Sequence, residues 1–212
     1  MVVMTMDEPV QAPVRTTLPA KPQRILVADD EHLVAAGLRS SLMELGFVVI
    51  GPASDGDHAI ELARSQKPDM ALLDIRMPNK DGIATGEVLA RQFGIPVVIV
   101  SAFSDPDYLE ACNRFQTFGF LLKPVTQDEL RVTIDIAWGR YRDYLEERGN
   151  VERLKVRLED RRIIEQAKWL LVNKKGITEP DAMRLLQRQA RNNRRTLVDV
   201  AKSLIENDQL LG

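Results

Sequence analysis

The sequence contains a single cysteine, Cys112, so no disulfide bond can form within the chain. A lone thiol fits a reducing cytoplasm, and we expect it to be an unreactive side chain on a helix. Long apolar runs are absent, because no stretch approaches the roughly 20 apolar residues that a membrane-spanning helix requires. Residues 1–23 lack a basic start and a continuous apolar core, so we expect no signal peptide. These absences predict a cytoplasmic protein with no membrane segment.

Histidine is nearly absent too, since only His32 and His58 occur in 212 residues. We interpret both as surface residues rather than as phosphate carriers or metal ligands. No arrangement of side chains typical of a hydrolase or a transferase appears, so we do not expect an enzyme. What the chain does have is 44% hydrophobic residues, which suits one medium domain and a smaller one.

Charge is distributed unevenly, although the overall net charge is only −2. Residues 151–212 hold 14 lysines and arginines against 9 acidic residues, a net charge of +5. The remainder holds 15 against 22, a net charge of −7. An acidic front and a basic rear suggest different partners for the two parts. Nucleic acid is one partner for a basic rear, but small helical domains are often modestly basic without binding it.

The front of the chain predicts a doubly wound α/β domain. Residues 1–22 contain four prolines and no periodicity, so we expect a disordered tail there. From Arg24 the pattern alternates strand and helix five times, which implies right-handed βαβ units and a five-stranded parallel sheet covered on both faces. The expected elements and signals include a helix over Glu31–Leu45, a strand over Phe47–Ile50, turns at Asp55-Gly56 and Asp81-Gly82, and helix caps at Ser104–Asp107 and Thr126–Glu129.

Polar side chains follow four of the predicted strands, at the point where each strand ends. Three are acids, one is a hydroxyl and one is a lysine followed by proline. Because the carboxyl ends of parallel strands meet at one edge of a sheet, where ligands bind in this class of fold, we expect these side chains to form one site. They are Asp29 and Asp30 after 25–28, Asp74 after 70–73, Ser101 after 97–100, and Lys123 after 118–122.

This ordered set resembles the receiver domain of two-component response regulators, over roughly residues 23–140. The resemblance implies a flavodoxin-like fold, phosphorylation of Asp74 by a sensor histidine kinase, and a phosphoryl group contacted by Ser101 and Lys123. It also implies a cis peptide at Lys123-Pro124 and a switch role for Phe120. One departure is Gln116-Thr117, where receivers usually have Gly-Ala, so the output surface near the last strand is expected to differ.

A metal ion is expected beside the phosphoacceptor, because phosphoryl transfer requires neutralisation of the phosphoryl oxygens. Carboxylates and a backbone carbonyl form an all-oxygen site of the kind that Mg²⁺ prefers, with water completing the shell. The predicted ligands are Asp30, Asp74 and the backbone carbonyl of Arg76, with Asp29 acting through water.

The last helix of the receiver has no clear end in the sequence. An apolar stripe with spacings of three and four continues through charged sequence, which predicts a short coiled coil over residues 141–158 and a homodimer, at least when phosphorylated. Gly149 is either a kink or a domain boundary, since glycine costs about 1 kcal/mol in a helix. The stripe consists of Leu130, Ile134, Ala137, Tyr141, Tyr144, Val151, Leu154 and Leu158.

Residues 154–212 predict a three-helix all-α domain, with a break at Lys175-Gly176 and caps at Thr178 and Thr196. From residue 154 to 206 the small, apolar and basic residues resemble the ANTAR domain of transcription antitermination regulators. The resemblance implies binding to paired RNA hairpins in transcript leaders, near terminators. The basic residues expected to contact RNA are Arg161, Lys168, Arg191, Arg194 and Arg195.

Two features of the rear leave alternatives open. Trp169 stands where the family generally has glycine, and it could contact RNA, a partner helix or the receiver, or simply pack. A DNA-binding regulator is the main rival function, but the helix from Thr196 to Glu206 carries only Lys202 as a base and lacks the polar residues of a recognition helix. A phosphorylation-dependent protein-interaction module is the third possibility.

Overall fold

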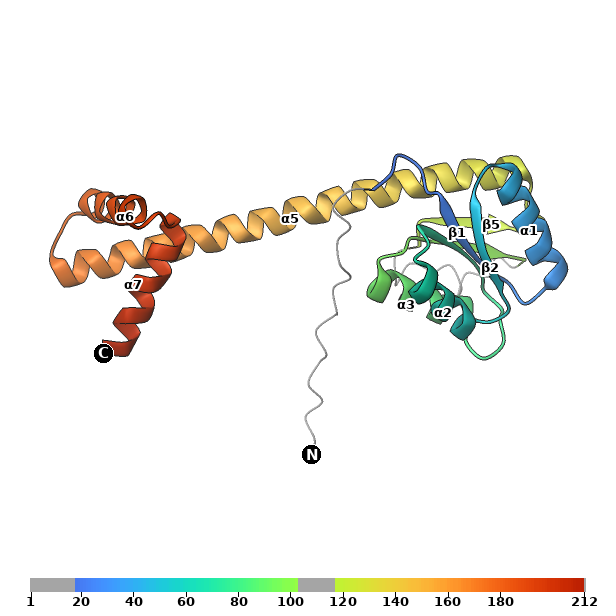
Figure 1. Cartoon of the computed structure of the whole chain (residues 1–212), viewed down its shortest axis with the longest axis horizontal. Coiled ribbons are helices and arrows are strands. Elements are labelled where there is room, and N and C mark those ends of the chain that lie inside the picture. The colour runs from blue at the N-terminus through green and yellow to red at the C-terminus, as the bar shows by residue number, and fades with distance from the viewer. Residues whose placement is uncertain (1–17, 103–116, 212) are drawn as a thin grey trace, which may run out of the picture. The chain divides into compact units, whose positions relative to one another are not determined.

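The computed structural model of the chain describes residues 18–102 and 117–211, with side chains to residue 208 (Figure 1). Most of the expected tail, the cap at Ser104–Asp107, Cys112 and Gln116 lie outside the described residues. The chain divides into two compact units, residues 1–145 and 146–212. Among the described residues, no helix is both long enough and apolar enough to cross a membrane.

The first unit is built on the predicted five-stranded parallel sheet. Neighbouring strands follow the order β2-β1-β3-β4-β5, and every pair is parallel. This is the order of a flavodoxin-like fold, in which the order of strand addition reverses between β1 and β3. The strands are β1 (Arg24–Ala28), β2 (Val48–Ala53), β3 (Met70–Asp74), β4 (Val97–Ser101) and β5 (Gly119–Leu122).

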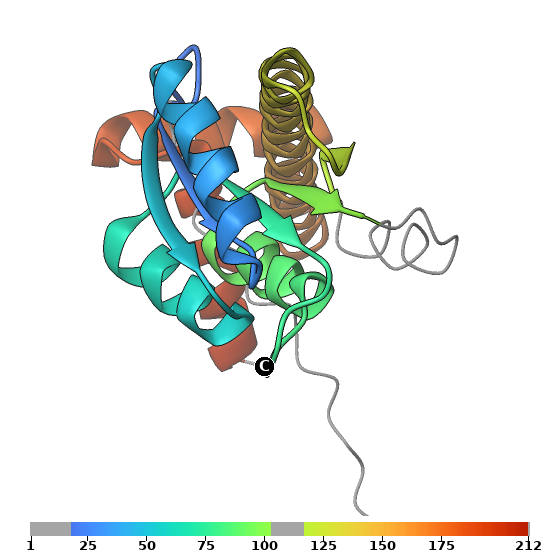
Figure 2. The same ribbon diagram turned by 90° about the vertical axis from the view of Figure 1, so that its right-hand side faces the viewer.

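Helices cover both faces of this sheet (Figure 2). On one face lie α1 (His32–Glu44) and the first part of α5 (Gln127–Lys175), which pack against alternate strand residues such as Val27 and Leu72. The other face is covered by α2 (Gly56–Gln66), α3 (Gly82–Val88) and the π-helical turn η1 (Leu89–Phe93), which pack against residues such as Leu73. Because both faces are covered, the three central strands β1, β3 and β4 are nearly continuous apolar runs.

Most predicted boundaries hold within one or two residues. Asp55 and Asp81 are more than turn residues, because each accepts a hydrogen bond from a backbone N–H in the first turn of the helix that follows. Thr126 and Glu129 form the predicted capping box at the start of α5. Two elements are longer than predicted: β2 continues past Ile50 to Ala53, beyond its apolar run, and the last helix continues past Glu206 to Leu211.

The helix α5 is continuous from Gln127 to Lys175, so Gly149 neither breaks it nor ends it. The first part of its apolar stripe packs into the core of the first unit, and the later part is exposed. Tyr141 is buried in the core of the first unit, donates a hydrogen bond to the Gly94 carbonyl and packs edge-on against Phe118, and Tyr144 packs there too. The stripe residues beyond the unit boundary are exposed, and it is these that remain for pairing with another helix.

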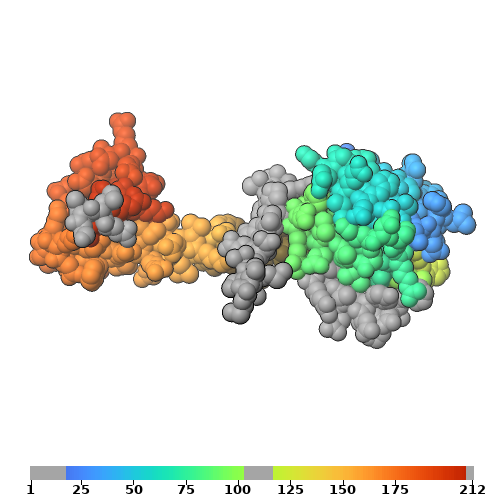
Figure 3. Space-filling view, turned by 90° about the horizontal axis from the view of Figure 1, so that it is seen from below, coloured from blue at the N-terminus to red at the C-terminus, as the bar shows by residue number. Residues whose placement is uncertain are grey.

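The second unit consists of the end of α5 with α6 (Glu179–Asn193) and α7 (Leu197–Leu211), as predicted. Its atoms are the orange to red ones in Figure 3. Thr178 caps α6, and Thr196 with Asp199 forms a capping box at α7. The core joins all three helices through small and branched side chains, which allow the helices to approach closely. Its fully or nearly buried members are Ala167, Leu171, Ala182, Leu186 and Ala201.

Candidate functional site

The carboxyl ends of β1 and β3 bring three aspartates together. Carboxylate oxygens of Asp29, Asp30 and Asp74 all lie within 4.8 Å of one another. Asp29 and Asp74 are only 2% and 6% exposed, whereas Asp30 is exposed. Two buried acids beside a third are costly unless a cation compensates them. The cluster is therefore built to hold positive charge.

Lys123 supplies one such charge from the end of β5. Its ammonium nitrogen lies 2.8 Å from Asp29 Oδ2 and 2.9 Å from Asp74 Oδ1. Burial alone would lower the pKa of Lys123, but hydrogen bonds and charges from Asp29 and Asp74 outweigh it and raise the pKa well above its ordinary value. Lys123 is therefore a permanent cation, held in contact with the carboxylate that it is expected to assist.

Asp74 is a buried carboxylate whose two oxygens are held in place by separate partners. Burial raises the pKa of its carboxyl above the ordinary value, and the hydrogen bond and charge of Lys123 offset only part of this shift. The backbone N–H of Arg76 donates to Asp74 Oδ2 at 2.8 Å, which leaves Oδ1 facing Lys123. A carboxylate oriented in this way is a suitable nucleophile for a phosphoryl group.

The acid cluster fits a small divalent cation. Asp29 Oδ2 is buried and, within the described part of the chain, accepts no hydrogen bond beyond its ion pair with Lys123. Three clustered carboxylates match the all-oxygen donor set that Mg²⁺ prefers. One lysine leaves the three aspartates with an excess of negative charge, which a divalent cation would neutralise.

The remaining predicted residues occupy the expected places. Ser101 is buried at the end of β4, one position beyond Val100, which pairs with Asp74 in the sheet. Phe120 is half-buried and packs against the core on the α2 and α3 side. The peptide bond between Lys123 and Pro124 is cis.

Two residues near the site escaped the sequence analysis. Glu31 lies 3.3 Å from the Lys123 nitrogen, so a third carboxylate shares this lysine. Gly82 begins α3 directly beside β3, and a Cβ atom there would lie 1.9 Å from the Asp74 carbonyl oxygen. The only sequence signals were that Glu31 follows the acid pair and that Gly82 follows Asp81.

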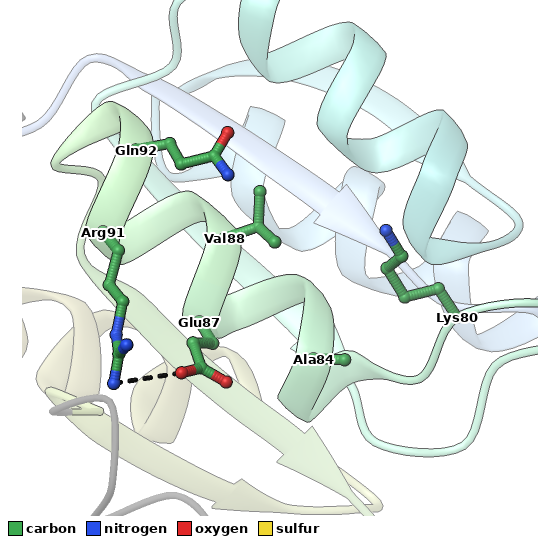
Figure 4. A pocket seen from close by; sticks show the side chains of 6 residues that line it. All are labelled: Lys80, Ala84, Glu87, Val88, Arg91 and Gln92. Carbon is green, nitrogen blue, oxygen red and sulfur yellow. Dashed lines mark ion pairs between the residues drawn. The ribbon is translucent and has the colours of Figure 1, made fainter. Parts of the chain in front are cut away.

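Two hollows in the surface of the first unit differ in their distance from the acid cluster. One of about 490 Å³ is lined by Asp30, residues 75–78 and Asp81, so it opens onto the acid cluster. Another, of about 360 Å³, lies over α3 and η1, away from the cluster (Figure 4). Its charges are already paired, Arg91 with Glu87 and Lys80 with Asp57. The first hollow is therefore the better candidate for donor access.

The predicted RNA-contacting residues of the second unit differ in their surroundings. Arg161, Arg191 and Arg194 are exposed, and exposed Arg195 donates to the Asp199 carbonyl and the Ser203 hydroxyl. Lys168 is only 9% exposed, and its nitrogen is held by Glu179 and by Glu165 at 2.9 Å. A lysine committed to two carboxylates fits poorly as a phosphate contact, so we remove Lys168 from the proposed interface.

Comparison with known families assigns both units. Residues 25–135 match the response regulator receiver domain, and residues 152–205 match the ANTAR domain. The chain therefore belongs to the response regulators, with a receiver domain followed by an ANTAR domain. This combination makes it a phosphorylation-controlled RNA-binding regulator and implies a histidine kinase as phosphodonor.

Its similarity to individual proteins agrees with this assignment. The chain is 38% identical over 187 residues to the transcriptional regulatory protein PdtaR of Mycobacterium tuberculosis, covering 88% of this chain and 91% of that protein. The receiver domain of the putative response regulator NarL from the same species is 34% identical, with a TM-score of 0.52 over 56% of this chain and 98% of that one. A receiver domain of a diguanylate cyclase from Desulfovibrio desulfuricans is 32% identical, with a TM-score of 0.54 over 57% and 97%.

Proposed function

We propose that Asp74 accepts the phosphoryl group and that its phosphorylation controls hairpin RNA binding and transcription antitermination by the rear domain. The observation that carries the first half is the ion pair of Lys123 with Asp74 and Asp29 at the strand ends. The Asp74 carboxylate attacks the phosphorus, the bond to the donor histidine breaks, and an acyl phosphate forms. Lys123 then binds one phosphoryl oxygen, and Ser101 donates its hydroxyl proton to another.

We propose Mg²⁺ as the divalent cation of this site, held by Asp30 and Asp74, with the Arg76 carbonyl and with Asp29 through water. When bound, the ion supplies charge neutralisation on the phosphoryl oxygens. The support for this assignment is the carboxylate cluster, whose three negative charges exceed the single charge of Lys123.

Replacing Asp30 with alanine is expected to weaken Mg²⁺ binding strongly, because an oxygen-only site loses one of its few anionic ligands. A calorimetric titration of Mg²⁺ measures this, and Asp128→Ala is the control, since Asp128 is an exposed acid outside the cluster. If both variants bind Mg²⁺ as tightly as the wild type does, Asp30 is not a ligand.

The proposed RNA interface of the second unit combines Arg161, Arg191, Arg194 and Arg195, on a domain whose net charge is positive. RNA hairpins are bound through phosphates, through unpaired loop bases and by stacking, and arginine suits the first and the last of these. The chain's similarity to PdtaR, a transcriptional regulatory protein, supports a role in gene expression.

Phosphorylation is expected to tighten binding to a two-hairpin RNA by roughly 5- to 150-fold, which corresponds to a coupling free energy of about 1–3 kcal/mol. Filter binding with and without phosphorylation, at two salt concentrations, measures both the switch and the phosphate contacts. Equal RNA affinity with and without phosphorylation would show that phosphorylation does not control RNA binding. Tighter binding to duplex DNA would support a DNA-binding regulator, and no binding to either nucleic acid would support a protein-interaction module.

We also propose that two copies pair through α5, along an apolar seam formed by Val151, Leu154 and Leu158, which are 47–67% exposed. The linker is then residues 146–158, because Tyr141 and Tyr144 belong to the core of the first unit, and it overlaps the start of the RNA-binding domain. Pairing would let one dimer hold two hairpins and raise the effective concentration of the second.

Leu158→Glu is expected to convert the dimer to a monomer, because it places like charges in the seam. Light scattering with and without a phosphoryl mimic measures the mass. The matched control is Val156→Glu, since Val156 is also exposed on α5 but lies on the opposite side from Leu158. A monomer in the wild type under both conditions would exclude this seam.

A further inference from the structure

Trp169 is the most unusual side chain of the second unit. It lies on α5 and is 65% exposed, whereas the core-facing residues of this helix, Ala167 and Leu171, are buried. The other tryptophan, Trp138, behaves conventionally, because it is buried in the first unit and its indole N–H donates to the Pro19 carbonyl at 3.2 Å. Leaving a large aromatic group in water is costly, so Trp169 is not there for packing within this unit.

The position of Trp169 continues a line of cations along α5. Residues seven apart in a helix differ by only about 20° around its axis, so they form a stripe. Three cations spaced by seven residues lead to Trp169 in this way, and the amide side chains of two further residues lie beside Trp169. We call this set the basic stripe, and its members, all exposed, are Arg148, Lys155, Arg162, Gln166, Trp169 and Asn173.

No carboxylate lies within the stripe, although this part of α5 is rich in acids. From the 3.6-residue period, the six members lie within about 60° of one another around the axis, and the acids fall outside that sector. Glu159 borders it and approaches Arg162 only to 3.9 Å, between side chains that are both exposed. The stripe therefore offers positive charge, amide hydrogen-bonding groups and one flat aromatic surface.

We propose that the basic stripe binds the loop of the hairpin RNA, with an unpaired base stacked on Trp169 and the adjoining phosphates on Lys155 and Arg162. This proposal rests on the proposed function and names a part of the protein that contacts the loop. Base stacking on exposed aromatic side chains beside a cationic track is how proteins hold single-stranded nucleic acid. Gln166 and Asn173, one turn to either side of Trp169, can donate to and accept from base edges.

A second copy of the chain fits this surface less well. The apolar seam ends at Leu158, and the positions that face the same way before Trp169 are charged, among them Arg162 and Glu165. Extending a parallel helix pair to Trp169 would bring the two Arg162 side chains together without a compensating acid inside the stripe. The charge of the stripe complements a polyanion instead.

The test uses the full-length chain and a hairpin RNA selected by the wild-type protein from a pool with a fixed stem and a randomised loop. Trp169→Ala is expected to weaken binding by roughly 5- to 150-fold, the loss that accompanies removal of one stacking partner. Trp169→Phe is expected to retain most of the affinity, because the ring still stacks. Bound RNA should quench the Trp169 fluorescence of the wild type and cause much less quenching in Trp169→Phe, where buried Trp138 remains.

Changes in the RNA test the proposal independently of changes in the protein. Loop nucleotides are replaced one at a time by abasic ones, and one replacement should reproduce the loss seen in Trp169→Ala without adding to it. Lys155→Gln with Arg162→Gln should make the slope of log affinity against log salt shallower, by about 0.7 for each phosphate that the variant no longer binds.

The outcomes separate this proposal from the proposed function. If the wild type selects no hairpin, the proposed function fails. If it does and Trp169→Ala binds equally well, the stripe is not the loop site. Trp169→Ala should keep the wild-type mass in light scattering, and a shift from dimer to monomer would assign Trp169 to the seam and overturn the proposal.

Discussion

Replacing Asp74 with asparagine is expected to abolish phosphorylation of this chain. Wild-type protein incubated with acetyl phosphate and Mg²⁺ should gain a single phosphoryl group, detected by intact-mass spectrometry. The amide of asparagine is not a nucleophile at neutral pH, yet it keeps the shape of the side chain and can still accept from the Arg76 N–H. The substitution therefore removes the chemistry and leaves the local hydrogen bond.

The control for this experiment is Asp57→Asn. Asp57 is an exposed aspartate whose partner is Lys80, at 2.9 Å, and it takes no part in the acid cluster. The Asp57→Asn protein should therefore be phosphorylated like the wild type. Undiminished labelling of Asp74→Asn would show that another residue accepts the phosphoryl group, and the proposed site would have to be abandoned.

Gly82→Ala is expected to have the largest effect on the fold around the site. A Cβ atom at Gly82 would lie 1.9 Å from the Asp74 carbonyl oxygen and 2.8 Å from its carbonyl carbon. Both contacts are with backbone, which cannot rotate away as a side chain could, so the start of α3 and the end of β3 must separate. Overpacking of this kind costs about 1–3 kcal/mol or more, and here it also displaces the phosphoacceptor.

Urea unfolding followed by circular dichroism measures the loss of stability, and the acetyl phosphate assay measures the loss of labelling. Gly37→Ala is the matched control, because Gly37 lies inside α1 and a Cβ atom there would have no heavy atom within 4 Å. Alanine is the better helix former by about 1 kcal/mol, so this control should be as stable as the wild type or slightly more stable. Equal stability of the two variants would contradict the close approach at Gly82.

The acid cluster was predictable because parallel strands place their carboxyl ends at one edge. Asp29, Asp74 and Lys123 each follow a short apolar run, so the topology alone brings them together. The contribution of Glu31 was not predictable, because it depends on how the long Lys123 side chain is directed across the edge. A sequence pattern locates strand ends but not the rotamers beyond them.

The rear of the chain shows where pattern analysis loses information. Tyr141 and Leu158 share one helical stripe, yet Tyr141 is buried in the receiver core and Leu158 is exposed, because the unit boundary lies between them. Lys168 is similar to its basic neighbours in sequence, but Glu179 from the next helix engages it. In both cases the deciding contact comes from a segment that local periodicity does not include.

The continuity of α5 restricts how the length of this chain can change in evolution. The same helix supplies Ile134 and Tyr141 to one core and Ala167 and Leu171 to another. Inserting one residue between them would rotate one set by about 100° relative to the other, whereas inserting seven restores the phase to within about 20°. Descendants of a common ancestor are therefore expected to gain or lose sequence here in steps of about seven residues. Recombination that exchanges output domains is expected to preserve the same helical phase.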